Sequence, residues 1–209
     1  MARTKLISRS TYTADYITLS EVKEYLRVEH TAEDVLITSL IDAAFDETEV
    51  YLGLDLTKKV YEYQVDYLPR QIEIINAPFI SVDSIKFTYG EWIDSTSVDG
   101  ISEFDGAITR DEVKNGSPVE RTLSSNNYRV FEEEYGATID ILISDEKVTD
   151  LFDVKVRYQA GHEVVEFPPI VKSAILLKVA SLYDTREDAN SRFLKQSNHL
   201  LNHYKNTHI

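Results

Sequence analysis

The clearest helical pattern of the chain lies in ITLSEVKEYLRVEHTAEDVLITSLIDAAFDETEVYLGLDL, residues 17–56. A first helix is expected to begin near Ser20, which can cap it, because apolar side chains then follow three and four residues apart. Thr31 can cap a second and longer helix, and the two acids that follow in its first turn favour the helix dipole. Gly53 stands where a C-terminal cap belongs. The sequence therefore predicts two consecutive helices within residues 18–56.

After these helices the apolar pattern changes to a period of two. Residues 60–67, VYEYQVDY, alternate apolar and polar side chains, which is typical of a half-buried strand. Further strands are expected at residues 85–89, 128–131, 138–143 and 154–158. Residues 90–125 are rich in Asp, Ser, Gly and Asn, which favour turns, so they predict a long polar loop. We expect an antiparallel β region over residues 57–160.

Two more helices are predicted at the C-terminal end. Pro168 and its neighbour are tolerated in a first helical turn, and an apolar stripe continues over residues 168–188. A last helix or tail occupies residues 189–209. This order of elements predicts an α+β fold, a helical bundle of N- and C-terminal helices with an inserted antiparallel β-sheet region and a long polar loop. We expect one domain over residues 1–209, with residues 1–17 as an N-terminal arm.

Charge is distributed unevenly along the chain. It holds 22 basic and 36 acidic side chains, a net charge of −14. None of the acids lies in residues 1–12 or 189–209, and each of these ends carries three Lys or Arg. The body, residues 13–188, therefore holds 16 basic and 36 acidic side chains and a net charge of −20. Such a surface repels phosphate, which argues against a body that grips DNA, whereas the basic ends suit an acidic partner.

Few residue patterns point to catalysis. The chain has no cysteine, which excludes thiolate metal sites and cysteine nucleophiles. Its glycines stand singly, so no glycine-rich loop can wrap a phosphate. No run approaches the roughly 20 apolar residues that a membrane span needs. We therefore expect no enzyme activity, no cofactor, no bound metal and no membrane partner.

One catalytic alternative stays open, an acidic metal-dependent enzyme that processes DNA during packaging. Its ligands would be carboxylates such as Glu132, Asp140 and Glu163, brought together from separate elements as a two-metal site requires. His162 and Glu163 also stand near Glu166, as in some metal sites. Two prolines follow this segment, so we do not expect the helix that would give zinc ligands their i, i+4 geometry.

Three phrases of the sequence, in order, resemble the head–tail connector (adaptor, or head-completion) proteins of tailed bacteriophages. The opening phrase comprises Val22, Leu26, Val28, Asp34, Leu36, Ile37, Leu40, Ile41, Ala44, Tyr51 and Gly53. The middle phrase, a proline-led strand, comprises Ala77, Pro78, Ser81, Val82, Asp83, Ser84 and Ile85. The closing phrase, a turn followed by a helix, comprises Tyr158, Ala160, Gly161, Pro168, Ala174, Ile175, Leu182, Tyr183, Arg186 and Glu187. The resemblance covers most of residues 17–188.

The resemblance implies a structural role in the virion, at the head–tail interface, with assembly in the bacterial host cytoplasm. Such proteins form a homo-oligomeric ring, usually a dodecamer, beneath the portal vertex. The ring extends the channel, through which genomic double-stranded DNA passes without specific binding. It also presents a docking surface for the next connector, stopper or tail protein. A tail-completion or tail-terminator ring protein is an alternative of similar size and setting.

The C-terminal stretch is the candidate segment for docking on the portal protein. It combines basic side chains with an apolar stripe, and an amphipathic basic helix can lie in a groove of a partner. The candidate docking residues are Arg192, Phe193, Lys195, Leu200, Leu201, Tyr204 and Lys205. The alternative is that this stripe packs on the helix bundle of the protein itself.

Overall fold

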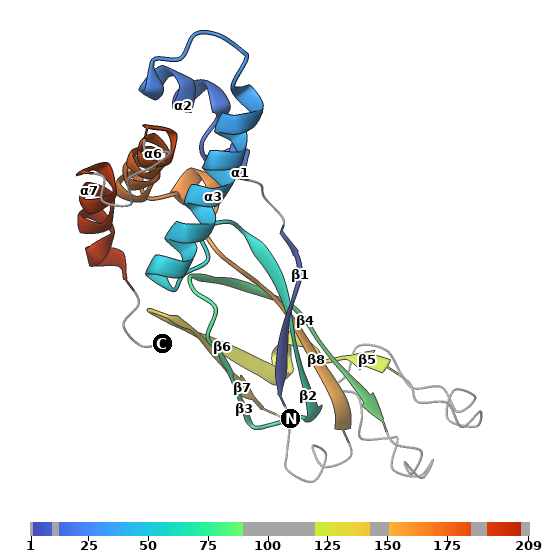
Figure 1. Cartoon of the computed structure of the whole chain (residues 1–209). Helices are drawn as coiled ribbons and strands as arrows, with labels where there is room; N and C mark the ends of the chain where they lie inside the picture. The colour runs from blue at the N-terminus through green and yellow to red at the C-terminus, as the bar shows by residue number, and fades with distance from the viewer. Residues whose placement is uncertain (1, 10–12, 90–119, 143–150, 185–191, 206–209) are drawn as a thin grey trace, which may run out of the picture. The chain divides into compact units, whose positions relative to one another are not determined.

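The computed structural model describes residues 2–9, 13–89, 120–142, 151–184 and 192–205. The chain forms two compact units (Figure 1). The β unit comprises residues 1–8 and 59–160, and the helical unit comprises residues 9–58 and 161–209. The predicted β region, residues 57–160, thus coincides with the β unit apart from one N-terminal strand. That the whole chain folds as a single cooperative domain stays a prediction.

The helical unit is built from five α-helices and two short 3-10 turns within the described residues. These are α1 (Thr13–Tyr16), α2 (Leu19–Leu26), α3 (Asp34–Leu52), η3 (Val164–Glu166), α6 (Pro169–Asp184), α7 (Arg192–Leu201) and η4 (Asn202–Tyr204). Thr18 caps α2 in a capping box, in which its hydroxyl accepts from the backbone N–H of Glu21 and the Glu21 carboxylate accepts from the backbone N–H of Thr18. Thr18, rather than Ser20, is therefore the cap, and α3 begins three residues after the predicted cap Thr31. Gly53 ends α3 with φ of 67°, as predicted.

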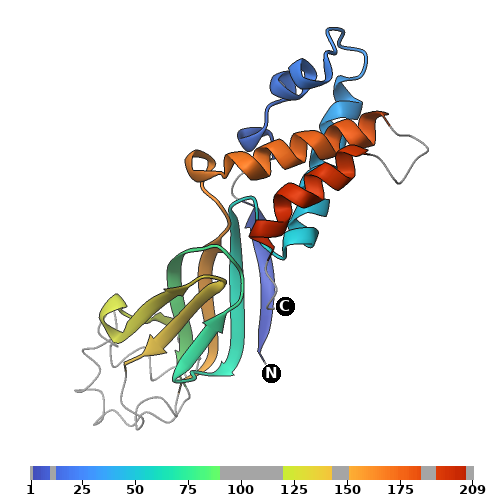
Figure 2. The same ribbon diagram turned by 90° about the vertical axis from the view of Figure 1, so that its left-hand side faces the viewer.

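The N- and C-terminal helices share one apolar core, as the sequence predicts. α6 packs against both α3 and α7 (Figure 2). The buried core residues of this unit are Tyr16, Ile17, Val22, Ile37, Ile41, Ala44, Phe45, Leu52, Leu56, Val171, Ala174, Ile175, Val179 and Leu201. No helix within the described ranges is long and apolar enough to cross a membrane.

The β unit contains two antiparallel sheets around a second core. Its strands are β1 (Arg3–Arg9), β2 (Lys59–Tyr67), β3 (Gln71–Ile74), β4 (Phe79–Tyr89), β5 (Glu120–Thr122), β6 (Tyr128–Glu133), β7 (Gly136–Ile141) and β8 (Leu151–Ala160). The sheet orders are β1-β2-β8-β4-β5 and β3-β7-β6. Alternate side chains of both sheets, such as Val156 of β8 and Ile139 of β7, are buried in the same core.

Two segments of the chain differ from the sequence-based description. The predicted arm, residues 1–17, is not simply a loose arm, because it contains the strand β1 and the short helix α1. Of the predicted polar loop, residues 90–119 lie outside the described residues. The end of that loop is ordered, since Glu120–Thr122 pair with β4 as β5 and residues 125–127 form a 3-10 turn.

Gly161 begins the C-terminal part of the helical unit at a point where the backbone is crowded. Its φ is 108°, and a Cβ atom built there would lie 2.2 Å from the carbonyl oxygen of Thr57. The hydroxyl of Tyr16 fixes the same region, because it donates to the carbonyl oxygen of His162 at 2.7 Å and accepts from the backbone N–H of Lys58 at 3.0 Å. Glycine is therefore required by this close approach of two backbone segments.

Candidate docking site on the C-terminal helix

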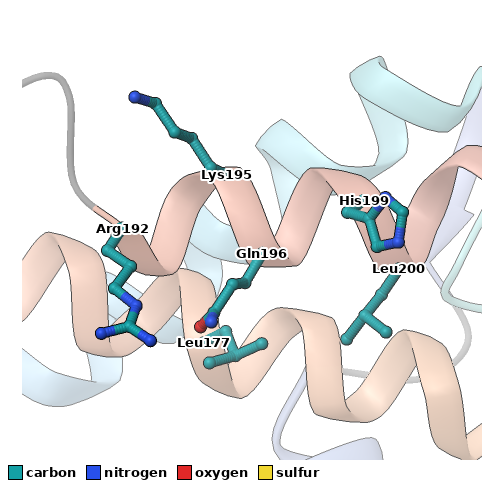
Figure 3. A pocket seen from close by; sticks show the side chains of 6 residues that line it. All are labelled: Leu177, Arg192, Lys195, Gln196, His199 and Leu200. Carbon is teal, nitrogen blue, oxygen red and sulfur yellow. The ribbon is translucent and has the colours of Figure 1, made fainter.

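The basic C-terminal segment forms one wall of a shallow groove between α6 and α7. The groove has a volume of about 450 Å³ and is lined by Leu177, Arg192, Lys195, Gln196, His199 and Leu200. Five of these residues belong to α7 and follow one another at helical spacing, so they share one face of the helix. Figure 3 shows Leu177 and Leu200 between the two helices, with Lys195 extending away from them. The groove combines an apolar floor with basic side chains at its rim.

The opposite face of α7 holds the helix on the unit. Leu201 is fully buried in the helical core, and Ser197 is also buried. The Ser197 hydroxyl donates to the carbonyl oxygen of Ala174 on α6, at 2.8 Å. Just beyond the helix, the hydroxyl of Tyr51 on α3 donates to the side-chain oxygen of Asn202 at 2.6 Å. These contacts join the C-terminal segment to both α6 and α3. The helix that lines the groove is therefore packed against the rest of the unit.

The groove face carries positive charge on an otherwise acidic protein. Arg192 and Lys195 are exposed, and neither forms an ion pair with any residue that the structure describes. Several other cations of the helical unit are paired, for example Lys172 with Glu21 at 2.7 Å. Charges that lie unpaired at the surface are available to a partner, and they steer an acidic surface toward this face.

The structure divides the predicted docking residues between the surface and the core. Arg192, Lys195 and Leu200 line the groove, and Phe193 is 36% exposed. Leu201 lies in the core, and Leu200 and Tyr204 pack partly against the same core. Lys205 lies with its Nζ 5.0 Å from the centroid of the Tyr51 ring. The alternative that the stripe packs on the protein's own bundle therefore describes its inner part, and the outer part remains accessible.

Sequence reasoning did not name three groove residues, Leu177, Gln196 and His199. The last two follow Arg192 by four and seven residues, so the helical period could have placed them on the same face. Leu177 lies on α6, and only the structure shows that it lines the groove.

A buried lysine lies in the same unit, on the side of α6 that faces α3. Lys178 is 2% exposed, and its ammonium lies 3.7 Å from the Glu47 carboxylate. Burial lowers the pKa of Lys178, because removal from water disfavours the charged form, while Glu47 partly offsets this effect. Its neighbour Leu177 lines the groove, but Lys178 itself is a core contact between two helices.

Two carboxylates of the metal-enzyme alternative have other partners. Asp140 accepts from the side-chain amide of Gln71 at 2.9 Å, and Glu163 forms an ion pair with Lys58. Val164–Glu166 form a 3-10 turn, so the helical i, i+4 spacing does not occur there. Among the residues that the structure describes, no three His, Asp or Glu side chains are grouped so that they could hold a metal ion.

The comparisons with known proteins bear on both the sequence and the fold. Residues 16–93 match the profile of the family described as "Phage gp6-like head-tail connector protein". The comparison with curated proteins finds no match. The resemblance to head–tail connector proteins that the sequence predicts is confirmed by the family match.

Solved structures with a similar fold come from gene transfer agent (GTA) particles. A chain in the neck of an empty GTA particle with C6 symmetry gives a TM-score of 0.66 at 14% identity, covering 99% of this chain and 97% of that chain. A chain in the virion of a native GTA particle gives 0.65 at 15% identity, covering 99% and 96%. A chain in the neck of a native GTA particle with C12 symmetry gives 0.59 at 13% identity, covering 98% and 97%. The whole chain, both units included, therefore has the fold of these chains.

Proposed function

We propose that this chain, a relative of the phage head–tail connector proteins, is a structural subunit of the neck that joins the head of a phage or phage-like particle to its tail. The match of residues 16–93 to the connector family carries this proposal. The similarity of the fold, over 99% of the chain, to chains from particle necks supports it. The protein acts by binding and by geometry and has no catalytic turnover.

In this role the subunits form a ring of twelve copies under the portal vertex. Similar chains occur in necks with C12 and with C6 symmetry, and a ring of twelve is compatible with both. The ring extends the channel for genomic DNA, and its lower face receives the next connector, stopper or tail protein. The net charge of −14 suits a channel wall, because a negative surface forms few phosphate contacts and lets DNA pass without specific binding.

The groove face of α7 is the surface that we assign to the portal protein. Arg192 and Lys195 are exposed and unpaired among the described residues, and Phe193 adds accessible apolar surface next to them. A partner segment with carboxylates and an apolar anchor fits this combination. Leu201 contributes indirectly, since its burial holds α7 in position.

Deletion of the gene for this protein from the genome of its phage or phage-like particle tests the proposed function. Without a connector, heads should fill with DNA but fail to join tails, so that electron microscopy of the lysate shows separate heads and tails. Complementation with the full chain should restore joined particles. Normal tailed particles in the absence of the protein would contradict a role in the neck.

The docking surface is tested by charge reversal. Arg192→Glu and Lys195→Glu should each weaken binding to the purified portal protein and reduce the salt dependence of that binding, because each removes one attractive charge. Arg27→Glu changes the charge equally on an exposed side chain of the same unit, at the C-terminal cap of α2, and is the matched control. Equal binding by all three variants would show that the groove face does not contact the portal.

A further inference from the structure

The N-terminal strand β1 is an edge strand that its own chain barely covers. It lies next to β2 at the end of the five-stranded sheet, and no described strand pairs with its other edge (Figure 1). Six of its seven residues are exposed and the seventh is half-buried. The side chains of Leu6 and Ile7 are 46% and 38% exposed. An edge strand with an apolar middle is a template for another strand, because one row of its backbone N–H and C=O groups has no partner strand.

β6 is a second open edge of the same unit, and its C-terminal end is acidic. It ends the three-stranded sheet, and among the described strands it pairs with β7 alone. Glu132 and Glu133 are exposed, and the Phe131 side chain is 50% exposed. Val130 points to the other face and packs partly on the core. β1 carries Arg3, Lys5 and Arg9 and no acid. β6 holds Arg129 near its start and Glu132 and Glu133 at its end, so the acidic end of β6 is complementary in charge to β1.

We propose that β1 of one copy of this chain pairs, antiparallel, with β6 of a second copy, which makes a continuous sheet across the contact between subunits. The contact is heterologous, because it uses a different edge on each copy. Each subunit therefore keeps one open edge for the next, and a repeated heterologous contact closes into a ring when its rotation permits. The choice of a second copy as the partner rests on the proposed ring and on this complementarity between the two edges.

One register of this pairing places opposite charges and apolar side chains across from each other. With Lys5 opposite Glu132, the next pairs are Leu6 opposite Phe131 and Ile7 opposite Val130. The pair of opposite charges and the two apolar pairs then lie directly across from each other, where cross-strand side chains interact most strongly. Ile7 falls on the face of Val130, so it extends the core of the partner's β unit. A slip by one residue would move every side chain to the other face and separate these pairs.

Cysteine cross-linking tests this register directly, because the chain has no cysteine of its own. Two full-length variants, Leu6→Cys and Phe131→Cys, carry tags of different mass and are mixed in equal amounts. They are treated with a mild oxidant or a short bis-maleimide. We expect mixed dimers to exceed the half of all dimers that random encounters give. The control mixture pairs Leu6→Cys with Ile75→Cys, an apolar residue of the β unit that is 77% exposed. This control should give the random share.

A charge exchange adds an independent readout. Lys5→Glu in the Leu6→Cys chain should lower the excess of mixed dimers by roughly 1.5- to 5-fold, the range of one cross-strand charge pair. Glu132→Lys in the partner variant should restore it. A random share of mixed dimers in the first experiment, an excess of Leu6→Cys homodimers, or no restoration by the exchange would overturn the proposal.

The same variants separate this inference from the proposed function. If rings form on the portal but the cross-links stay random, the strand pairing is wrong and the role in the neck is unaffected. If the cross-links form at the predicted positions but the protein does not bind portal or join heads to tails, the pairing is supported and the proposed function is wrong.

Discussion

Replacement of Leu201 by alanine tests whether α7 is a packed part of the helical unit. Leu201 is 0% exposed and lies in the core shared by α3, α6 and α7. Burial of a leucine side chain contributes about 1.5–3 kcal/mol. A residual cavity adds to the loss, so a Leu→Ala change at a fully buried site costs about 2–5 kcal/mol. We expect Leu201→Ala to lower the free energy of unfolding by about 3 kcal/mol.

Urea unfolding followed by far-UV circular dichroism measures this loss. With a slope of about 2 kcal/mol per molar urea, the midpoint should fall by about 1.5 M. Gln196→Ala lies on the groove face of the same helix and should change the free energy by no more than about 0.5 kcal/mol. Leu201→Met keeps most of the volume and should cost less than about 1.5 kcal/mol. Equal midpoints for Leu201→Ala and Gln196→Ala would refute the packing of α7.

The remaining predictions concern a cap, a glycine and a buried charge. Thr18→Ala removes the hydroxyl that accepts at the start of α2 and should cost about 1 kcal/mol in urea unfolding, whereas Thr18→Ser should restore most of it. Gly161→Ala should lower the melting temperature more than an exposed Gly→Ala change does, because its Cβ would lie 2.2 Å from the Thr57 carbonyl oxygen. A melting temperature equal to that of the wild type would contradict this. Lys178→Met should stabilise the protein at neutral pH, since the lysine is buried. Because burial lowers the pKa of Lys178, the unfolded chain binds more protons than the folded chain at pH values between the lowered and the ordinary lysine pKa. Wild-type stability should therefore rise with pH in that range, and the stability advantage of Lys178→Met should shrink. An advantage that stays constant in melts at neutral and alkaline pH would contradict this.

The helical unit could be predicted in large part because its helices carry their own signals. The apolar side chains of α3 recur at the helical period, and Gly53 marks the end of the helix with a positive φ. The last helix shows the limit of such reasoning. A stripe that contains Leu200 and Leu201 predicts that one face is covered, but the sequence does not say whether the protein or a partner covers it. The structure places Leu201 inside the unit and leaves the face of Arg192 open.

The edge strands β1 and β3 were missed for a different physical reason, whereas the edge strand β6 was predicted. β1 has no buried side chain among Arg3–Arg9, so it lacks the alternation by which half-buried strands are found. Its place in the sheet depends on backbone hydrogen bonds, which leave no trace in the side-chain pattern. β3 spans only Gln71–Ile74, too short a run for the period of two to stand out. Open edges of this kind are what the strand pairing between copies would use.

Electron microscopy of the purified protein mixed with the portal protein of the same particle tests whether this chain is a connector subunit. We expect averages of the complex to show a ring of added density on one face of the portal, coaxial with the DNA channel. Averages of the portal alone should lack this density. Portal particles without added density, at protein concentrations well above those of the portal, would contradict a connector role for this chain.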